Sequence, residues 1–269
     1  MSQVNDAITD TKIQVEPIYK AQSDAFGFFD YPFLLDMINQ NHSSKILDIG
    51  TGEGSFLIGL AQRTLNIKFD AIDLNEGLVE IAKSNSRLLG VNINFQHANF
   101  GENYTEANYD LIIARFAVEH IRALEDIDSF IKTTYEKLKL NGWLVIIEYY
   151  VHELDIDDPT WKKFRQSETE TYASAKAHPR IGLRLPESLT KAKYRNIRSI
   201  INHISPSTIG EEYFYNLVQE YTKLYSQIAP EFWTDGIADE VISWCNKRQS
   251  KGEPSLFTSY TIGQKLVAS

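Results

Sequence analysis

The chain has 269 residues, of which 43% are hydrophobic and 23% are charged. This composition is typical of a soluble globular protein and excludes a disordered or fibrous chain. The formal charge is −9. The chain therefore lacks the excess of Lys and Arg with which proteins neutralise nucleic-acid phosphates. The N-terminus has no signal pattern, and no run approaches the roughly 20 apolar residues of a membrane span. We therefore expect a cytoplasmic protein with no nucleic-acid partner and no membrane partner.

The potential metal ligands in the sequence are few and scattered. Cys245 is the single cysteine, so it forms no intrachain disulfide, and no Cys or His lies near it at the spacing of a zinc site. We predict that Cys245 is a small buried residue on a helix. The six histidines are dispersed, and no Asp/Asp/Asn magnesium set is visible. The sequence therefore predicts no metal.

Strands and helices alternate through the first part of the chain. An apolar strand at residues 45–49 leads into a glycine-rich turn, and from Ser55 apolar residues recur at helical spacing. Asn141 and Gly142 form the predicted turn before a later apolar strand. The same alternation predicts strands at residues 68–73, 91–96, 109–114 and 143–148, and helices at residues 77–89 and 124–138. This order favours a parallel sheet with helices on both faces.

The pattern becomes more helical after residue 150, and it is also helical before the first strand. Residues 12–40 are an aromatic-rich segment that we predict to be a helical cap. Further predicted elements are a helix at residues 186–193, a strand at 196–203, helices at 211–228 and 237–247, and a strand at 255–267. The fold class is therefore α/β, with seven mostly parallel strands, an N-terminal helical cap and a helical insertion before the last strand.

We expect three parts along the chain. They are a helical cap at residues 1–44, a core at residues 45–150, and a remainder at residues 151–269 that completes the core and carries lid helices, with the insertion at about residues 207–254.

A glycine-rich loop follows the first strand. Gly50, Gly52 and Gly54 let a ligand approach the backbone at the carboxyl end of that strand. The third glycine comes one residue earlier than in the dinucleotide fingerprint G-x-G-x-x-G, where Ser55 stands instead. The phosphate loop G-x-x-x-x-G-K-[ST] is absent. The loop therefore predicts a nucleotide-like ligand and disfavours a nicotinamide-dependent oxidoreductase.

The segment from Ile46 to Gly54 resembles the first motif of the class I S-adenosylmethionine-dependent methyltransferases. Further family-like motifs follow in order at the expected strand ends: Ala71-Ile72-Asp73, Ala98-Asn99-Phe100, Tyr109-Asp110-Leu111-Ile112 and the turn from Leu138 to Trp143. The resemblance covers residues 45–150 well and the last two strands more weakly. It implies a Rossmann-like sheet and S-adenosyl-L-methionine as the cofactor, with S-adenosyl-L-homocysteine as the product.

The resemblance assigns roles to two acids and to the loop. Asp48 would face the methionine ammonium of the cofactor, and Asp73 would accept both ribose hydroxyls. Taken alone, Asp73 is equally a candidate for the N-cap of the next helix. The loop residues against which the methionine end would lie are Gly50, Thr51, Gly52 and Gly54.

The resemblance also implies a slot for the adenine. Leu74 and Phe100 would sandwich the ring, and Asn99 would bond its amino edge. The family more often has Asp at that position, and an amide can make the same bond. Phe100 in isolation is more typical of a core residue. Tyr19 in the predicted cap could close over the sulfonium of the cofactor.

The residues after the fourth strand indicate the type of acceptor. Arg115-Phe116-Ala117-Val118-Glu119-His120 contains nothing like the Asn/Asp-Pro-Pro-Tyr/Phe motif of enzymes that methylate adenine or glutamine amides. It resembles small-molecule methyltransferases of the UbiE-like and natural-product type, which implies that Arg115 lies over the methionine end of the cofactor. The alternative for Arg115 is a surface ion pair with Glu119, one helical turn away.

Methyl transfer from a sulfonium is an in-line displacement, in which alignment supplies much of the rate. A base is needed only where the nucleophile is protonated at working pH. The candidate bases are His120, Glu148, His152 and His178. His152 and His178 are favoured because they fall in the variable segment that usually lines the substrate pocket in this family. The alternative for each histidine is a structural role without part in catalysis.

Together these residues predict a metal-independent methyltransferase that acts on an O, N or C atom of a small apolar or aromatic molecule, as a monomer or homodimer. One alternative is a methyltransferase fold that keeps the cofactor for another reaction or for sensing, and another is a protein methyltransferase. The aromatic residues Phe214, Tyr221, Tyr225, Trp233 and Trp244 would either enclose the acceptor or pack the insertion on the core.

Overall fold

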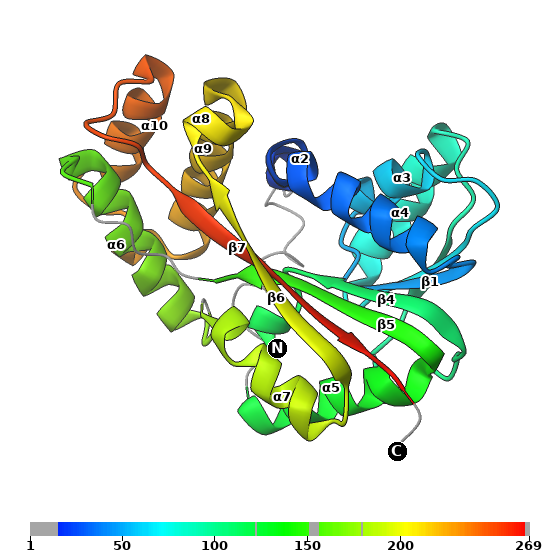
Figure 1. The fold of residues 1–269 in the computed structure, drawn as a ribbon. Coiled ribbons are helices and arrows are strands. Elements are labelled where there is room, and N and C mark those ends of the chain that lie inside the picture. Colours follow the sequence, from blue (N-terminus) through cyan, green and yellow to red (C-terminus); the bar gives the residue numbers. More distant parts are fainter. Residues whose placement is uncertain (1–15, 122, 151–155, 179, 267–269) are drawn as a thin grey trace.

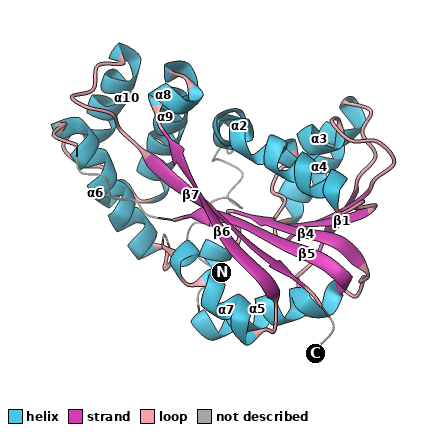
Figure 2. Cartoon of the chain, viewed as in Figure 1, coloured by secondary structure: helices cyan, strands magenta, loops and turns pink. Residues whose placement is uncertain are grey.

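The computed structural model describes residues 16–121, 123–150, 156–178 and 180–266. The centre is a seven-stranded sheet of order β3-β2-β1-β4-β5-β7-β6, in which β7 runs antiparallel to both of its neighbours. Helices cover both faces of this sheet (Figures 1 and 2). The predicted α/β class is thereby confirmed. The division of the chain at residues 44 and 150 stays a prediction.

The strands match the predicted ones in order, with two shifts. Their bounds are β1 (Lys45–Ile49), β2 (Lys68–Asp73), β3 (Asn94–His97), β4 (Tyr109–Arg115), β5 (Leu138–Tyr149), β6 (Arg195–Ile204) and β7 (Leu256–Gln264). The third strand begins three residues later than predicted. The fifth begins five residues earlier, so the prediction of a turn at Asn141 and Gly142 was wrong.

These two residues form an irregularity inside β5. Asn141 has a positive φ of 66°, and the pairing with β4 shifts register between Tyr109 and Leu111. The backbone of Asn141 donates a hydrogen bond to Lys265 O, and Lys265 N donates to Gly142 O. The end of β7 therefore supports the bulge, which a local sequence pattern does not show.

The helices divide into two groups. Their bounds are α2 (Glu16–Gln40), α3 (Ser55–Ala61), α4 (Glu76–Leu88), α5 (Leu124–Lys137), α6 (Pro159–Ser174), α7 (Leu185–Lys191), α8 (Pro206–Ile209), α9 (Glu211–Ile228) and α10 (Ile237–Lys247), with short 3-10 turns η1 (Val118–His120), η2 (Ile181–Leu183) and η3 (Pro230–Phe232). The insertion between β6 and β7 is helical, as predicted. None of these described helices is long and apolar enough to cross a bilayer.

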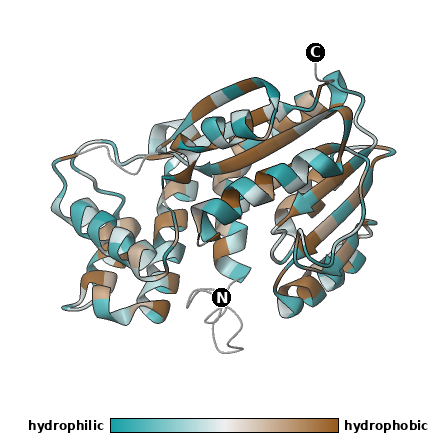
Figure 3. Ribbon diagram, turned by 90° about the horizontal axis from the view of Figure 1, so that it is seen from below, coloured by the Kyte–Doolittle hydropathy of each residue, from teal (hydrophilic) through white to brown (hydrophobic). Residues whose placement is uncertain are grey.

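The strands alternate their side chains between two apolar layers. Ile46 of β1 joins a core with α3, α4 and the C-terminal half of α2, whereas the next residue, Leu47, joins a core with α5 and α7. In Figure 3 the central strands are largely brown for this reason. Full burial of such a side chain stabilises the fold by about 1.5–3 kcal/mol. The two-sided sheet is thus a consequence of apolar residues on both faces of each strand.

A helical lobe, made of α6, α8, α9 and α10, packs against the N-terminal half of α2 (Figure 1). Its centre is Trp161, which stacks on Trp244 at 5.9 Å and on Phe164 at 5.3 Å between ring centroids. Asp158 caps α6 through Trp161 N and also accepts a hydrogen bond from Trp244 Nε1. Cys245 is buried in the lobe, as predicted.

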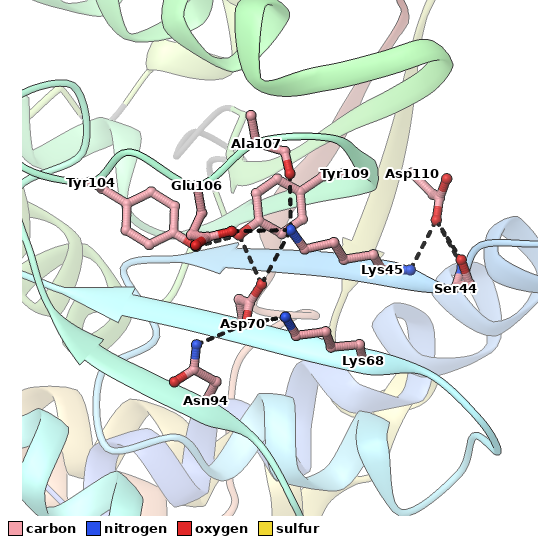
Figure 4. Close-up of polar contacts among 10 residues, drawn as sticks. All are labelled: Ser44, Lys45, Lys68, Asp70, Asn94, Tyr104, Glu106, Ala107, Tyr109 and Asp110. Carbon is pink, nitrogen blue, oxygen red and sulfur yellow. Dashed lines mark hydrogen bonds and ion pairs between the residues drawn. The ribbon is translucent and has the colours of Figure 1, made fainter.

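A polar network ties together the amino ends of four strands (Figure 4). The buried carboxylate of Asp70 accepts hydrogen bonds from Asn94 Nδ2 and Tyr109 OH, both at 2.9 Å. The ammonium groups of Lys45 and Lys68 lie 3.8 and 3.9 Å from it. This carboxylate is fully satisfied by its neighbours, so the network joins β1, β2, β3 and β4 at the end of the sheet opposite the glycine loop.

A second buried ion pair joins α2 to the sheet. Arg115 Nε on β4 donates to Asp30 Oδ2 at 2.8 Å, and Tyr260 OH on β7 donates to Asp30 Oδ1 at 2.7 Å. The side chains are 8% exposed for Arg115 and 1% for Asp30. A charge removed from water to this degree requires its partner, so the pair holds α2 in place.

We predict that Asp30→Asn lowers the free energy of unfolding by about 3–5 kcal/mol, because it leaves the buried guanidinium without a counter-charge. Urea denaturation measures the loss. Asp36→Asn, an exposed position on the same helix, should change stability by less than about 0.5 kcal/mol. Adding Arg115→Met to Asp30→Asn should recover part of the loss, and equal losses in the single and double variants would contradict the assignment.

Candidate functional site

The glycine loop takes a conformation that requires glycine. Gly50, Gly52 and Gly54 have φ values of 76°, 58° and 84°, in the left-handed region that other residues avoid. Gly50 N and Thr51 N both donate to Ile72 O at the end of β2. A Cβ on Gly50 would lie 2.6 Å from Ala117 Cβ, so the loop also fits closely against the segment after β4.

Asp73, at the carboxyl end of β2, holds the loop from the other side. Its Oδ2 accepts a hydrogen bond from Gly52 N and its Oδ1 accepts one from Asn75 N, both at 2.8 Å. The side chain of Asn75 accepts from Leu78 N and caps α4. The N-cap alternative for Asp73 was therefore wrong, and its carboxylate belongs to the glycine loop.

Asp48 lies on β1 directly beneath this loop and is buried. Burial raises its pKa to about 6, with the charge of Arg115 opposing the shift. Thr51 is buried in the loop beside it. A buried acid of this kind favours a cationic partner at the loop.

Tyr19, on the first turns of α2, reaches the loop from above. A Cβ on Gly52 would meet its ring at 3.3 Å. Burial raises the pKa of its hydroxyl, and the charges of Asp73 and Glu53 add to the rise. The structure therefore brings Tyr19 to the loop, and its action on a sulfonium stays a prediction.

The residues predicted to hold adenine lie at the ends of β2 and β3. Leu74 is 54% exposed, and its carbonyl oxygen is 3.1 Å from His97 Nε2. Phe100 is half-buried and packs on Phe130 at 5.3 Å between ring centroids. Asn99 N donates to Asn103 Oδ1. The structure thus brings Leu74, Asn99 and Phe100 to one edge, while the Phe100 ring also belongs to the core, as its alternative interpretation predicted.

Arg115 is buried rather than exposed. It pairs with Asp30, donates to Gln22 O at 3.2 Å, and lies 4.5 Å from the centroid of the Phe56 ring. The predicted alternative, a surface ion pair with Glu119, was wrong because α2 supplies a closer carboxylate from 85 residues away in the sequence.

Two of the three candidate histidines lie near one another. The Nε2 atom of His120 is 3.7 Å from Glu119 Oε1, and burial lowers the pKa of His120 to about 4, so the ring is neutral at pH 7. His178 N donates to Glu119 O at 2.8 Å. His152 lies outside the described residues. Within the described ranges, no group of three His, Cys, Asp or Glu residues could hold a metal ion.

The structure brings together two acids that the sequence offered separately, Glu148 as a candidate base and Glu119 as a partner of Arg115. Glu148, at the end of β5, accepts hydrogen bonds through Oε1 from Ala117 N, Val118 N and Glu119 N. Glu119 itself is 3% exposed. Burial raises the pKa of both, and the charge of Glu148 adds to the rise for Glu119. The sequence predicted neither the burial of Glu119 nor its place beside Glu148, because η1 and β5 meet only in the folded chain.

We predict that Gly50→Ala is more destabilising than Gly90→Ala, although both positions have positive φ values, of 76° and 65°. Each should lose about 1–2 kcal/mol through backbone strain. Gly50→Ala should lose about 1–3 kcal/mol more, because its methyl group meets Ala117, whereas no atom lies within 4 Å at Gly90. Urea denaturation measures both. Adding Ala117→Gly should recover the extra loss, and its persistence would count against the close fit.

Comparison with known proteins identifies the family. A family model described as a methyltransferase domain matches residues 40–220. The phosphoethanolamine N-methyltransferase of Plasmodium falciparum is 27% identical over 203 residues, which are 72% of this chain and 71% of the relative. The carboxy-S-adenosyl-L-methionine synthase of Nautilia profundicola is 34% identical over 109 residues, which are 40% of this chain and 46% of the relative. The chain thus spans about half the length of that relative.

The fold is also similar to those of solved methyltransferase structures. Phosphoethanolamine N-methyltransferase 2 of Haemonchus contortus, solved with phosphomonomethylethanolamine and S-adenosylhomocysteine, superposes with a TM-score of 0.63 at 17% identity. The superposition covers 98% of this chain and 60% of that one, and at this identity it shows the fold alone. Because the family model matches more than half of its residues, the chain belongs to the class I S-adenosylmethionine-dependent methyltransferase family.

Proposed function

We propose that the protein transfers a methyl group from S-adenosyl-L-methionine to an O, N or C atom of a small molecule. The observation that carries the proposal is the glycine loop held by Asp73. This carboxylate and the buried Asp48 flank a backbone of three glycines at the carboxyl ends of β1 and β2. In parallel sheets this is where nucleotide-like ligands bind.

The residues present suit the chemistry of this cofactor. Asp48 would face the methionine ammonium, since a buried carboxylate is stabilised by an opposite charge. Asp73 would accept the ribose hydroxyls, and Leu74, Asn99 and Phe100 would hold the adenine. Gly50, Thr51, Gly52 and Gly54 would leave room for the methionine end, and Arg115 would lie behind it.

The bound cofactor supplies a methyl group on a positively charged sulfur. The chain aligns the acceptor with this methyl group and excludes water. Tyr19 from α2 covers the loop, while Phe116 and Tyr149, 5.0 Å apart between ring centroids, form an apolar wall at the ends of β4 and β5. Holding the acceptor and the methyl group in line raises the reaction rate, because the two reactants no longer have to find this geometry by chance.

The candidate bases are His120, Glu148, His152 and His178. The His120 ring is neutral at pH 7 and so has a free lone pair, but with a pKa of about 4 it is a weak base. His178 lies on the same side, through its backbone bond to Glu119. We propose an apolar or aromatic acceptor, a metal-independent reaction, a monomer or homodimer and a cytoplasmic location, in keeping with a single cysteine.

A second candidate is a reaction that uses the cofactor without transferring its methyl group. The similarity to a carboxy-S-adenosyl-L-methionine synthase supports this candidate, because that relative is named for a product other than a methylated acceptor. A protein acceptor is a further alternative.

We predict that calorimetric titration detects binding of S-adenosylmethionine and S-adenosylhomocysteine and no binding of NAD. Asp73→Ala should weaken the binding of both sulfur ligands about tenfold to a hundredfold, because it removes a charged hydrogen-bond acceptor. Asp239→Ala, at an exposed acid on α10, is the matched control and should leave both affinities within about twofold.

Transfer of label from methyl-labelled S-adenosylmethionine to a small acceptor then separates the two candidates. Label that stays on the cofactor while another product forms favours the second. If neither sulfur ligand binds the wild type, the roles proposed for the loop and Asp73 are wrong.

A further inference from the structure

Three carboxylates are buried together beyond the glycine loop. Glu119 on η1, Glu148 on β5 and Glu168 on α6 are 3%, 0% and 1% exposed. The charges of Glu148 and Glu168 both raise the pKa of Glu119, so the three lie within electrostatic reach of one another. Buried carboxylates are costly unless each has a partner.

Two of the three have partners. Glu148 Oε1 accepts three backbone hydrogen bonds, and Glu168 forms an ion pair with Arg165. Glu119 differs because neither of its oxygens accepts a hydrogen bond from a described residue; its Oε2 is buried, as is the unbonded Oε2 of Glu148. The nearest basic group to its other oxygen is His120 at 3.7 Å, which is neutral at pH 7 because burial lowers its pKa to about 4.

Four buried tyrosines lie within electrostatic range of this carboxylate. Burial raises the pKa of each, and the negative charge of Glu119 adds to the rise in all four: Tyr149, Tyr172, Tyr221 and Tyr225. Their rings pack at centroid distances of 6.4 Å for Tyr149 and Tyr172, 5.9 Å for Tyr172 and Tyr225, and 5.3 Å for Tyr221 and Tyr225. The faces of aromatic rings attract cations.

The carboxylate cluster is continuous with the glycine loop. Gly50 fits closely against Ala117, and Ala117 N donates to Glu148 at 3.0 Å. Two residues further along the same segment is Glu119. The unpartnered oxygen therefore lies one layer of residues beyond the loop, on the side of β4 and β5.

We propose that the acceptor of the methyl group is an amine, which binds as its ammonium ion to Glu119 among the four tyrosines. This inference rests on the proposed methyl transfer. Before reaction, the ammonium gives one proton to the Glu119 carboxylate. The nitrogen lone pair then forms the new C–N bond as the C–S bond of the sulfonium breaks, and the electron pair of that bond stays on sulfur. Glu119 is thus a catalytic residue.

The charges favour an amine over other acceptors. A neutral aromatic alcohol would supply no counter-charge to Glu119, and an acidic acceptor would bring a like charge towards it. Two arginines are already paired, Arg115 with Asp30 and Arg165 with Glu168. An added cation would therefore meet in Glu119 a carboxylate with no hydrogen bond to either oxygen, whereas Glu148, whose Oε2 is also unbonded, already accepts three backbone hydrogen bonds through Oε1.

Choline and its neutral isostere 3,3-dimethylbutan-1-ol test the proposal in the full chain saturated with S-adenosylhomocysteine. We predict saturable binding of choline and binding of the alcohol that is about tenfold weaker or absent. Choline has no titratable ammonium proton, so any proton released near pH 7 comes from the protein. Loss of this release in Glu119→Gln would assign the proton to Glu119. Calorimetry in phosphate and in Tris buffer measures the release.

Glu119→Gln is the matched variant, with the same size and no charge. It should weaken choline about tenfold and abolish the proton release, while it leaves S-adenosylhomocysteine affinity within about twofold. Glu212→Gln, at an exposed position on α9, should behave as wild type. In the labelled assay, 2-phenylethylamine should accept methyl where 2-phenylethanol does not.

The outcomes are separable. If S-adenosylhomocysteine does not bind, the proposed function fails. If it binds while choline shows no saturable binding, or binds no better than the alcohol, the amine proposal is overturned. Undiminished choline binding by Glu119→Gln overturns it as well. Should that variant fail to fold, the comparison of choline with the alcohol and the proton release in wild type decide alone.

Discussion

The ion pair between Asp30 and Arg115 is the contact on which the functional end of the molecule depends. It joins α2 to the end of β4, and Tyr260 extends it to β7. With α2 fixed there, its first turns place Tyr19 on Gly52 and its Gln22 against Tyr221 of α9. One buried pair thereby sets the position of Tyr19 over the glycine loop and that of the helical lobe, because α2 carries Tyr19 and packs against the lobe.

Buried carboxylates at the two ends of the sheet differ in their hydrogen bonding. At the amino ends of the strands, Asp70 has two hydrogen-bond donors and two nearby ammonium groups. At the carboxyl ends, Glu119 keeps a buried oxygen with no partner among the described residues. A fully satisfied network stabilises a fold, whereas a buried polar group without a partner is costly.

The helical lobe serves both stability and the site. Trp161 and Trp244 stack in its core, and the same helix α9 that packs on this core carries Tyr221 and Tyr225 to the carboxylates. The insertion between β6 and β7 therefore cannot be treated as a separate lid. Its packing fixes the positions of the rings that lie within electrostatic range of Glu119.

Local pattern in the sequence determined most of the elements, the order of strands and helices, and the glycine loop, because periodicity and glycine conformation are properties of short segments. It missed the bulge at Asn141, which β7 supports, and the partner of Arg115, which lies 85 residues away. The cluster around Glu119 draws on η1, β5, α6 and α9. Only tertiary packing decided which charges meet and which stay unpaired, since burial and distance depend on segments that are remote in sequence.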